Sequence, residues 1–135
     1  MRFKHIPGVK MDKVVIIRAA DQDAQRKTSG GRATAINFAG IGDSGNSWIG
    51  TVTLKPGDRT GGHHHGRHEV ALYVVKGRAR LNWGEKLEEF ADVEPGDFAY
   101  FPPFIPHGET NLDDQEPVEF LVVRSDDEKI VVPLS

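Results

Sequence analysis

Short apolar runs, separated by turn-forming residues, occur along most of this chain. Residues 14–17 (VVII) and 70–75 (VALYVV) are continuously apolar, which predicts strands buried on both faces. Residues 79–83 (ARLNW) alternate instead, so that Ala79, Leu81 and Trp83 are expected to face a core. The pattern has the two-residue period of strands and gives no convincing helix.

The same pattern predicts further strands and one polar connection. Apolar or alternating segments at turn-separated intervals are expected to be strands: 32–39, 47–57, 86–93, 95–103, 107–111, 118–123 and 129–134. The polar stretch 21–31 (DQDAQRKTSGG) predicts a loop or a short arm. About ten short strands without a repeat period are typical of a sandwich or barrel rather than a propeller.

Composition supports one all-β domain over residues 1–135. A chain of 135 residues with 38% hydrophobic and 27% charged residues is large enough for a single core and too short for two. Valine (13) and isoleucine (8) exceed leucine (7), which favours strands, and 15 glycines with 8 prolines require many turns.

Charge and cysteine content narrow the possible partners and ligands. A net charge of −3 offers no broad basic surface, so we expect neither nucleic acid nor a membrane as a partner. The absence of cysteine removes thiolate ligands and thiol nucleophiles, so that a metal would need nitrogen and oxygen ligands. Because the N-terminus lacks an apolar signal segment and no run is long enough to span a membrane, we expect a cytoplasmic protein.

Histidines gather at one place in the sequence. Four lie within six residues, at positions 63, 64, 65 and 68, and His107 follows about forty residues later. Side chains two apart on a strand share a face, so His63 and His65 are expected to converge while His64 points away to the surface. Glu69 opens the next strand and His107 follows a proline-stiffened turn, so both are further candidate ligands.

These residues resemble the two motifs of the cupin superfamily, G-x5-H-x-H-x(3,4)-E-x6-G and G-x5-P-x-G-x2-H-x3-N. Nine positions match in order, between Gly57 and Asn111: Gly57, His63, His65, Glu69 and Gly77 in the first motif, and Gly96, Pro102, His107 and Asn111 in the second. The resemblance implies one cupin domain, a jelly-roll barrel also called a double-stranded β-helix. It also implies a metal inside one mouth of the barrel, with His63, His65, Glu69 and His107 as ligands.

Two departures from the family pattern bear on the site. Seven residues separate Glu69 from Gly77 where the pattern has six. Since a slip of one residue reverses the face of a strand, Glu69 points inward only if a bulge or longer turn absorbs the extra residue, and His68 is the alternative ligand. The second departure is Phe104, which stands where the second motif has glycine and is expected to change the loop more than the ligands.

Three imidazoles and a carboxylate suit one divalent transition metal: Fe, Mn, Ni, Co, Cu or Zn. Four protein ligands leave about two positions open on an octahedral ion, which favours catalysis, with Glu69 also a possible general base. We therefore expect a metal-dependent enzyme, a dioxygenase or a lyase, isomerase or cyclase, that acts on a small oxygen-rich molecule.

Two other functions stay open, since cupins resemble one another across many activities. One is a non-catalytic module that binds metal or a small ligand, and the other is a metal-free protein similar to sugar epimerases. We also expect a homodimer, because edge strands and the apolar segment 14–17 offer surfaces for pairing. The aromatic residues of the strands are expected to fill the barrel: Tyr73, Phe98, Tyr100, Phe101, Phe104 and Phe120.

Overall fold

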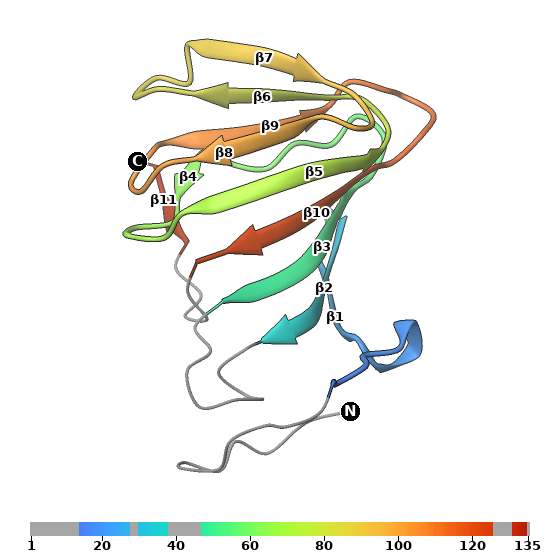
Figure 1. The fold of residues 1–135 in the computed structure, drawn as a ribbon. Helices are drawn as coiled ribbons and strands as arrows, with labels where there is room; N and C mark the ends of the chain where they lie inside the picture. The colour runs from blue at the N-terminus through green and yellow to red at the C-terminus, as the bar shows by residue number, and fades with distance from the viewer. Residues whose placement is uncertain (1–13, 28–29, 38–46, 126–130, 135) are drawn as a thin grey trace.

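A computed structural model describes residues 14–27, 30–37, 47–125 and 131–134, which form two antiparallel sheets (Figure 1). The six strands of the first sheet lie in the order β1 (Asp23–Lys27), β2 (Gly30–Asn37), β3 (Trp48–Leu54), β10 (Val118–Arg124), β5 (Val70–Lys76) and β8 (Phe98–Phe101). The five strands of the second lie in the order β11 (Val132–Pro133), β4 (His63–His64), β9 (His107–Asn111), β6 (Ala79–Trp83) and β7 (Glu89–Val93). One 3₁₀ turn, η1 (Ala19–Asp21), precedes β1.

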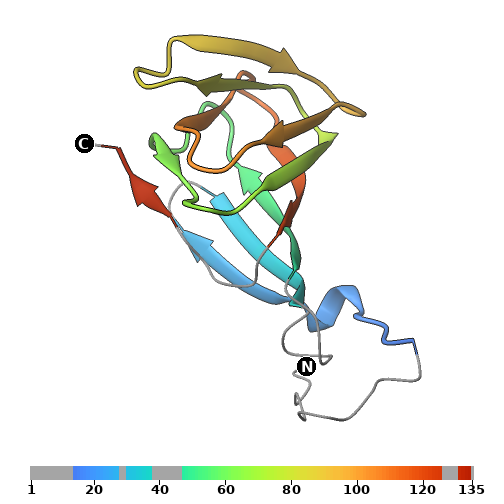
Figure 2. The ribbon, with the colours of Figure 1, turned by 60° about the vertical axis from the view of Figure 1, so that its left-hand side comes forward.

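Strands distant in sequence are neighbours in both sheets, which identifies a jelly roll rather than a meander. β10 lies between β3 and β5, and β9 lies between β4 and β6 (Figures 1 and 2). The first sheet supplies most of the core, and Ala79 and Leu81 of β6 meet it from the second. The predicted all-β fold, a jelly roll or double-stranded β-helix, is therefore confirmed.

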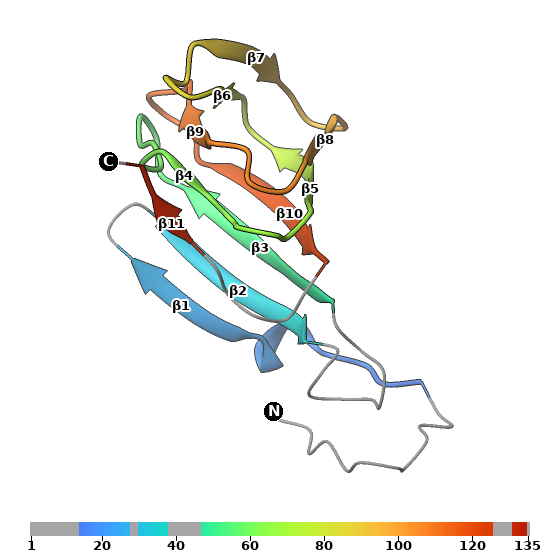
Figure 3. The ribbon, with the colours of Figure 1, turned by 90° about the vertical axis from the view of Figure 1, so that its left-hand side faces the viewer.

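The N-terminal part of the described chain differs from expectation. Val14 and Ile16 belong to no strand and are 83% and 56% exposed, so the prediction of a buried strand there was wrong. The polar stretch beyond them is not a loop throughout, because β1 pairs with β2 from Asp23↔Thr34 to Lys27↔Gly30 (Figure 3). Backbone pairing within this hairpin outweighs the weak strand propensity of its polar side chains.

Aromatic residues divide between the interior and the surface. Phe101 and Phe120 are buried in the core as expected. Phe98 and Tyr100 are instead exposed, because β8 alternates and only one of its faces is covered. Phe104 lies in the turn after β8 and is exposed as well. The barrel-filling prediction was wrong for these three residues.

Two motif residues have structural roles that explain their identity. Gly77 has φ +84°, and a Cβ there would lie 2.6 Å from the carbonyl oxygen of Pro117, so that only glycine fits. The buried Asn111 donates Nδ2 hydrogen bonds to the carbonyls of Leu54, Lys55 and Glu116 at 3.3, 3.1 and 2.9 Å. Asn111 thus joins the end of β3 to the turn before β10.

Across the described residues, no helix is long and apolar enough to cross a membrane.

Candidate metal centre

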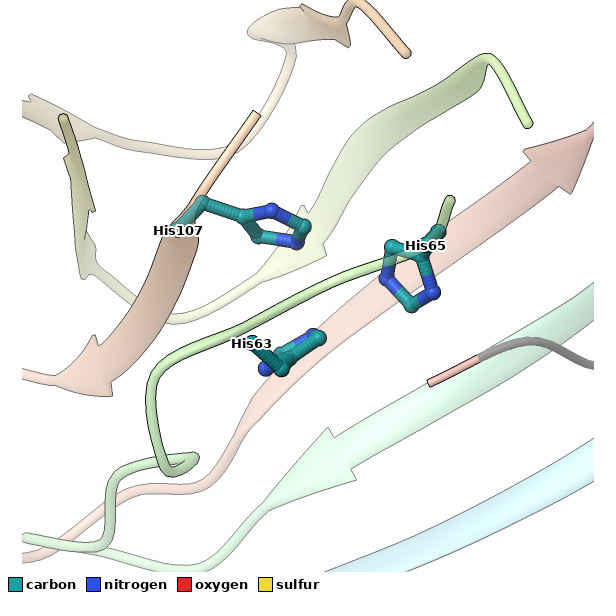
Figure 4. A group of neighbouring side chains, drawn as sticks. All are labelled: His63, His65 and His107. Atoms are coloured by element: carbon teal, nitrogen blue, oxygen red, sulfur yellow. The ribbon is translucent and has the colours of Figure 1, made fainter. Parts of the chain in front are cut away.

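His63, His65 and His107 converge at one point of the molecule (Figure 4). His63 pairs directly with His107 across β4 and β9, and His65 follows two residues after His63. One ring nitrogen from each histidine lies within 4.8 Å of the others, and the ring centroids are 4.5 to 5.1 Å apart. The structure therefore brings three of the four predicted ligands together, as the two-residue period required.

Backbone carbonyls orient two of these rings. His63 Nδ1 lies 2.7 Å from the carbonyl oxygen of Gly61, and His107 Nδ1 lies 3.0 Å from that of Ile105. A carbonyl only accepts, so in both contacts Nδ1 carries the proton and donates it, which leaves the Nε2 lone pair available. This arrangement is common among metal-binding histidines, where the second nitrogen fixes ring orientation.

Burial favours the neutral form of the His107 imidazole. Desolvation lowers the pKa of His107 below its usual value, and the nearby charge of Glu109 and the Ile105 hydrogen bond only partly oppose it. A neutral imidazole is the form that binds metal. Its surroundings thus prepare His107 for coordination.

The structure does not bring Glu69 to the three histidines. Its side chain is exposed, and its Oε1 accepts a hydrogen bond of 3.1 Å from the Tyr100 hydroxyl. β5 pairs with β10 without interruption from Val70↔Arg124 to Tyr73↔Leu121, and Glu69 continues this register by exchanging hydrogen bonds with Ser125. The register of β5 against β10 does shift further along, between Val74 and Lys76, but this irregularity leaves Val70 buried and Glu69 exposed.

The other two clustered histidines also lie outside the group. His68, the alternative ligand, is buried but is not one of the residues whose nitrogens converge. His64 accepts a 3.0 Å hydrogen bond at Nδ1 from the Gly66 amide, and its ring lies 6.1 Å from that of Phe104. Its role is local to the turn.

A carboxylate that the motif analysis overlooked lies beside the histidines. Glu109 Oε1 is 3.7 Å from His107 Nε2, and Glu109 Oε2 accepts a 2.7 Å hydrogen bond from the Thr60 hydroxyl. Glu109 is two residues from His107 on β9, so both side chains are on the same face. The alternation that identified His63 and His65 also identifies Glu109.

The three histidines and Glu109 line a cavity of about 80 Å³ between the two sheets. The facing wall comes from the first sheet and is mostly apolar, with Val52, Leu72 and Phe120 among its residues. Arg32, Trp48 and Arg124 lie in the same wall and were also missed from the sequence. A small molecule in this cavity would contact the histidines directly.

The fold and the histidine group define a double-stranded β-helix protein with a candidate metal centre. The model of the cupin domain matches residues 50–124, more than half of the chain, so the chain belongs to the cupin family. The resemblance drawn from the two motifs is confirmed. No curated protein matches the sequence significantly.

Solved structures share this fold. An uncharacterised double-stranded β-helix protein of Klebsiella pneumoniae is 18% identical, with a TM-score of 0.70 over 91% of this chain and 99% of that one. Oxalate decarboxylase of Bacillus subtilis is 27% identical, with a TM-score of 0.75 over 95% of this chain. The matched region is 34% of the decarboxylase, so this chain spans about a third of its length. The Bacillus enzyme has Mn(II) centres.

Proposed function

We propose that this protein binds one divalent transition metal through His63, His65 and His107 and acts enzymatically on a small oxygen-bearing molecule. The observation that carries the proposal is the convergence of three imidazole nitrogens within 4.8 Å on the wall of a cavity. Three histidines rarely meet in this way for packing alone, since each ring also needs hydrogen-bond partners.

The donor set fits such a metal. Imidazole nitrogens with a carboxylate suit Fe, Mn, Ni, Co, Cu and Zn, whereas Ca and Mg prefer oxygen ligands. Mn(II) is the first metal to test. The oxalate decarboxylase of Bacillus subtilis, which is 27% identical to this chain, has Mn(II) centres.

Two carboxylates are candidates for the fourth ligand. Glu109 has the stronger support, because its Oε1 lies 3.7 Å from the His107 Nε2 atom. With Nδ1 of His107 protonated, these two atoms are both acceptors, and a cation between them relieves their repulsion. For Glu69 to bind the metal, its side chain would have to break its hydrogen bond with Tyr100 and turn inward. We therefore assign the fourth ligand to Glu109.

The cavity supports catalysis rather than a purely structural metal. A bound divalent metal supplies Lewis acidity toward a chelating oxygen group. The protein's own residues hold the imidazoles in place, and the apolar wall excludes water around the bound molecule. The small volume limits substrates to compact molecules.

Reconstitution with single metals tests this function. Metal-free protein is loaded with Mn(II), Fe(II) or Zn(II) and given oxalate, hydroxy acids, diketones and sugars, while oxygen uptake and product formation are followed. We expect turnover that requires metal, disappears in His107→Ala and persists in His64→Ala. Oxygen consumption would identify a dioxygenase, whereas oxygen-independent turnover would identify a lyase, isomerase or cyclase.

Two results would replace this proposal. Turnover by the metal-free protein would identify the epimerase-like alternative. Tight metal binding without conversion of any compound would favour the non-catalytic module.

We also propose that the protein forms a homodimer. Phe98 and Tyr100 are 77% and 60% exposed on β8, the edge strand of the first sheet, and Val14 and Ile16 add exposed apolar surface. Light scattering should give about twice the 14.9 kDa of one chain. Phe98→Glu should shift the particle toward the monomer, and a monomeric wild-type protein would contradict the proposal.

A further inference from the structure

Thr60 holds the carboxylate of Glu109 through its side-chain hydroxyl. The hydroxyl oxygen accepts a 2.9 Å hydrogen bond from the Glu109 amide and lies 2.7 Å from Oε2 of the same residue. A backbone amide only donates and a carboxylate only accepts, so the single proton of the hydroxyl is directed to Oε2. The hydroxyl is thereby committed to one oxygen of this carboxylate.

Backbone pairing brings the two residues together. Residues 57–60 run antiparallel to β9, where the Thr60 amide donates to the Glu109 carbonyl at 2.8 Å and Arg59 forms a bridge with Thr110. Residues that lie opposite each other in such a pair have side chains on the same face. Thr60 and Glu109 both line the cavity, and the side chain of Glu109 is only 13% exposed. The contact with Oε2 is therefore fixed by the backbone and sheltered from water.

The two oxygens of the Glu109 carboxylate have different surroundings. Oε2 is bound to the Thr60 hydroxyl, whereas Oε1 lies 3.7 Å from Nε2 of His107, one of the three convergent histidines. Turning Oε2 toward the histidines as well would break its hydrogen bond with Thr60. The carboxylate thus offers Oε1, and not both oxygens, to a metal at the histidines.

We propose that Thr60 is a positioning residue that restricts Glu109 to one metal-binding oxygen and so leaves room for a substrate that chelates through a pair of oxygens. Three imidazoles and one oxygen leave about two positions open on an octahedral ion, whereas a bidentate carboxylate would leave about one. The substrate class is then a small molecule with two neighbouring oxygen donors, such as a hydroxy acid or a diketone, in a cavity of about 80 Å³. This inference rests on the proposed function, because it concerns the same metal centre.

Counting the water molecules on bound Mn(II) tests the role of Thr60. Electron spin echo spectroscopy in D2O gives this number for the wild type, Thr60→Val and Thr60→Ser, each at saturating Mn(II). Valine has the shape of threonine without its hydroxyl, whereas serine keeps the hydroxyl. We expect about two waters in the wild type and in Thr60→Ser, and about one in Thr60→Val, because the released Oε2 also binds the ion.

Ligand affinity gives a second measure of the open positions. Glycolate can chelate through its carboxylate and its hydroxyl, whereas acetate has the same charge and lacks the hydroxyl. In calorimetric titrations of Mn(II)-loaded protein, glycolate should bind about tenfold more tightly than acetate to the wild type and Thr60→Ser, and at most about twofold more tightly to Thr60→Val. Thr110→Val is the matched control, because Thr110 follows Glu109 on β9 with its side chain on the other face.

The results separate this inference from the proposed metal centre. A wild type with about one water on Mn(II), or a Thr60→Val protein that keeps about two, would overturn the role of Thr60 and leave the metal centre intact. Loss of Mn(II) from Thr60→Val would also overturn it, because the hydroxyl would then be needed to retain the ion. The count in the wild type tests the inference independently of how the variants fold. A wild type that binds no metal would contradict the proposed function together with this inference.

Discussion

Glu109 Oε1 lies 3.7 Å from Nε2 of His107, the ring nitrogen that the Ile105 carbonyl leaves available. The distance follows from strand geometry, because the two residues are neighbours on one face of β9. The Thr60 hydroxyl fixes the carboxylate by donating to Oε2 at 2.7 Å. A carboxylate is thus held at the histidine group from β9 rather than from the start of β5.

Substitution of the two carboxylates distinguishes their roles. We expect Glu109→Gln to weaken Mn(II) binding by about tenfold or more, because an anionic oxygen beside the imidazoles is lost. Glu69→Gln should change the affinity by less than about twofold, since its side chain binds Tyr100 at the surface. Competition with a chelator measures both. The opposite ranking would return Glu69 to the ligand set.

The lowered pKa of His107 predicts a pH dependence for the metal-free protein. Because burial lowers this pKa in the folded state, the unfolded chain takes up the proton first as the pH falls below about 6.5. The stability that neutral His107 contributes is therefore complete above about pH 6.5, and it is lost as the pH falls from there to the lower pKa of the folded state. His107→Gln should therefore reduce the slope of unfolding free energy against pH by up to about 1.4 kcal/mol per unit. Equal slopes in urea titrations at several pH values would contradict this assignment.

Phe104 has φ +63° at a position where the second motif has glycine. Left-handed backbone costs a non-glycine residue about 1–2 kcal/mol, whereas glycine adopts it without strain. Glycine also raises the conformational entropy of the unfolded chain, which offsets part of this gain in stability. Phe104→Gly should therefore be about 1 kcal/mol more stable than Phe104→Ala in urea unfolding. Phe98 on β8 is the matched control, and there alanine should be the more stable replacement. Greater stability of alanine at position 104 would mean that the loop relaxes.

Asn111 supplies a prediction about the fold alone. Its amide donates to three carbonyl oxygens, and its Oδ1 accepts a 2.8 Å hydrogen bond from the Asp113 amide. Asn111→Ala should lower the free energy of unfolding by about 2–3 kcal/mol, because buried polar groups lose their partners. Asn111→Asp should cost at least as much, since a carboxylate would face the same carbonyls. Unchanged urea midpoints would show that water replaces these bonds.

Most of the architecture could be predicted from residue pattern and motif spacing. Alternation along 79–83 and the apolar run from Val70 correspond to β6 and β5, and both have buried inward faces. The apolar run 14–17 is no buried strand, because an apolar run is buried only where another element covers it. Whether another element covers the run depends on long-range strand pairing, which the local sequence pattern does not reveal.

The site was predictable in part for the same reason. His63 and His65 share a face by period, and His107 joins them through the β4 and β9 pairing that the family motifs imply. The position of Glu69 depended on whether a bulge would turn it inward. The register of β5 with β10 does shift between Val74 and Lys76, but Glu69 stays exposed. The inward direction of Arg124 could be predicted, because Arg124 continues the alternating run Val118, Phe120, Val122. Its approach to Trp48 could not, because it depends on the register between β10 and β3.

Metal analysis of protein purified without an affinity tag or chelator tests the central claim most directly. Plasma mass spectrometry should find about one transition-metal ion per chain in the wild type and in His64→Ala, whose imidazole lies outside the group. His63→Ala and His107→Ala should each lose most of the ion, because each removes one of three convergent imidazoles. Equal metal content in all four proteins, or none in the wild type after exposure to Mn(II), Fe(II) and Zn(II), would contradict the account.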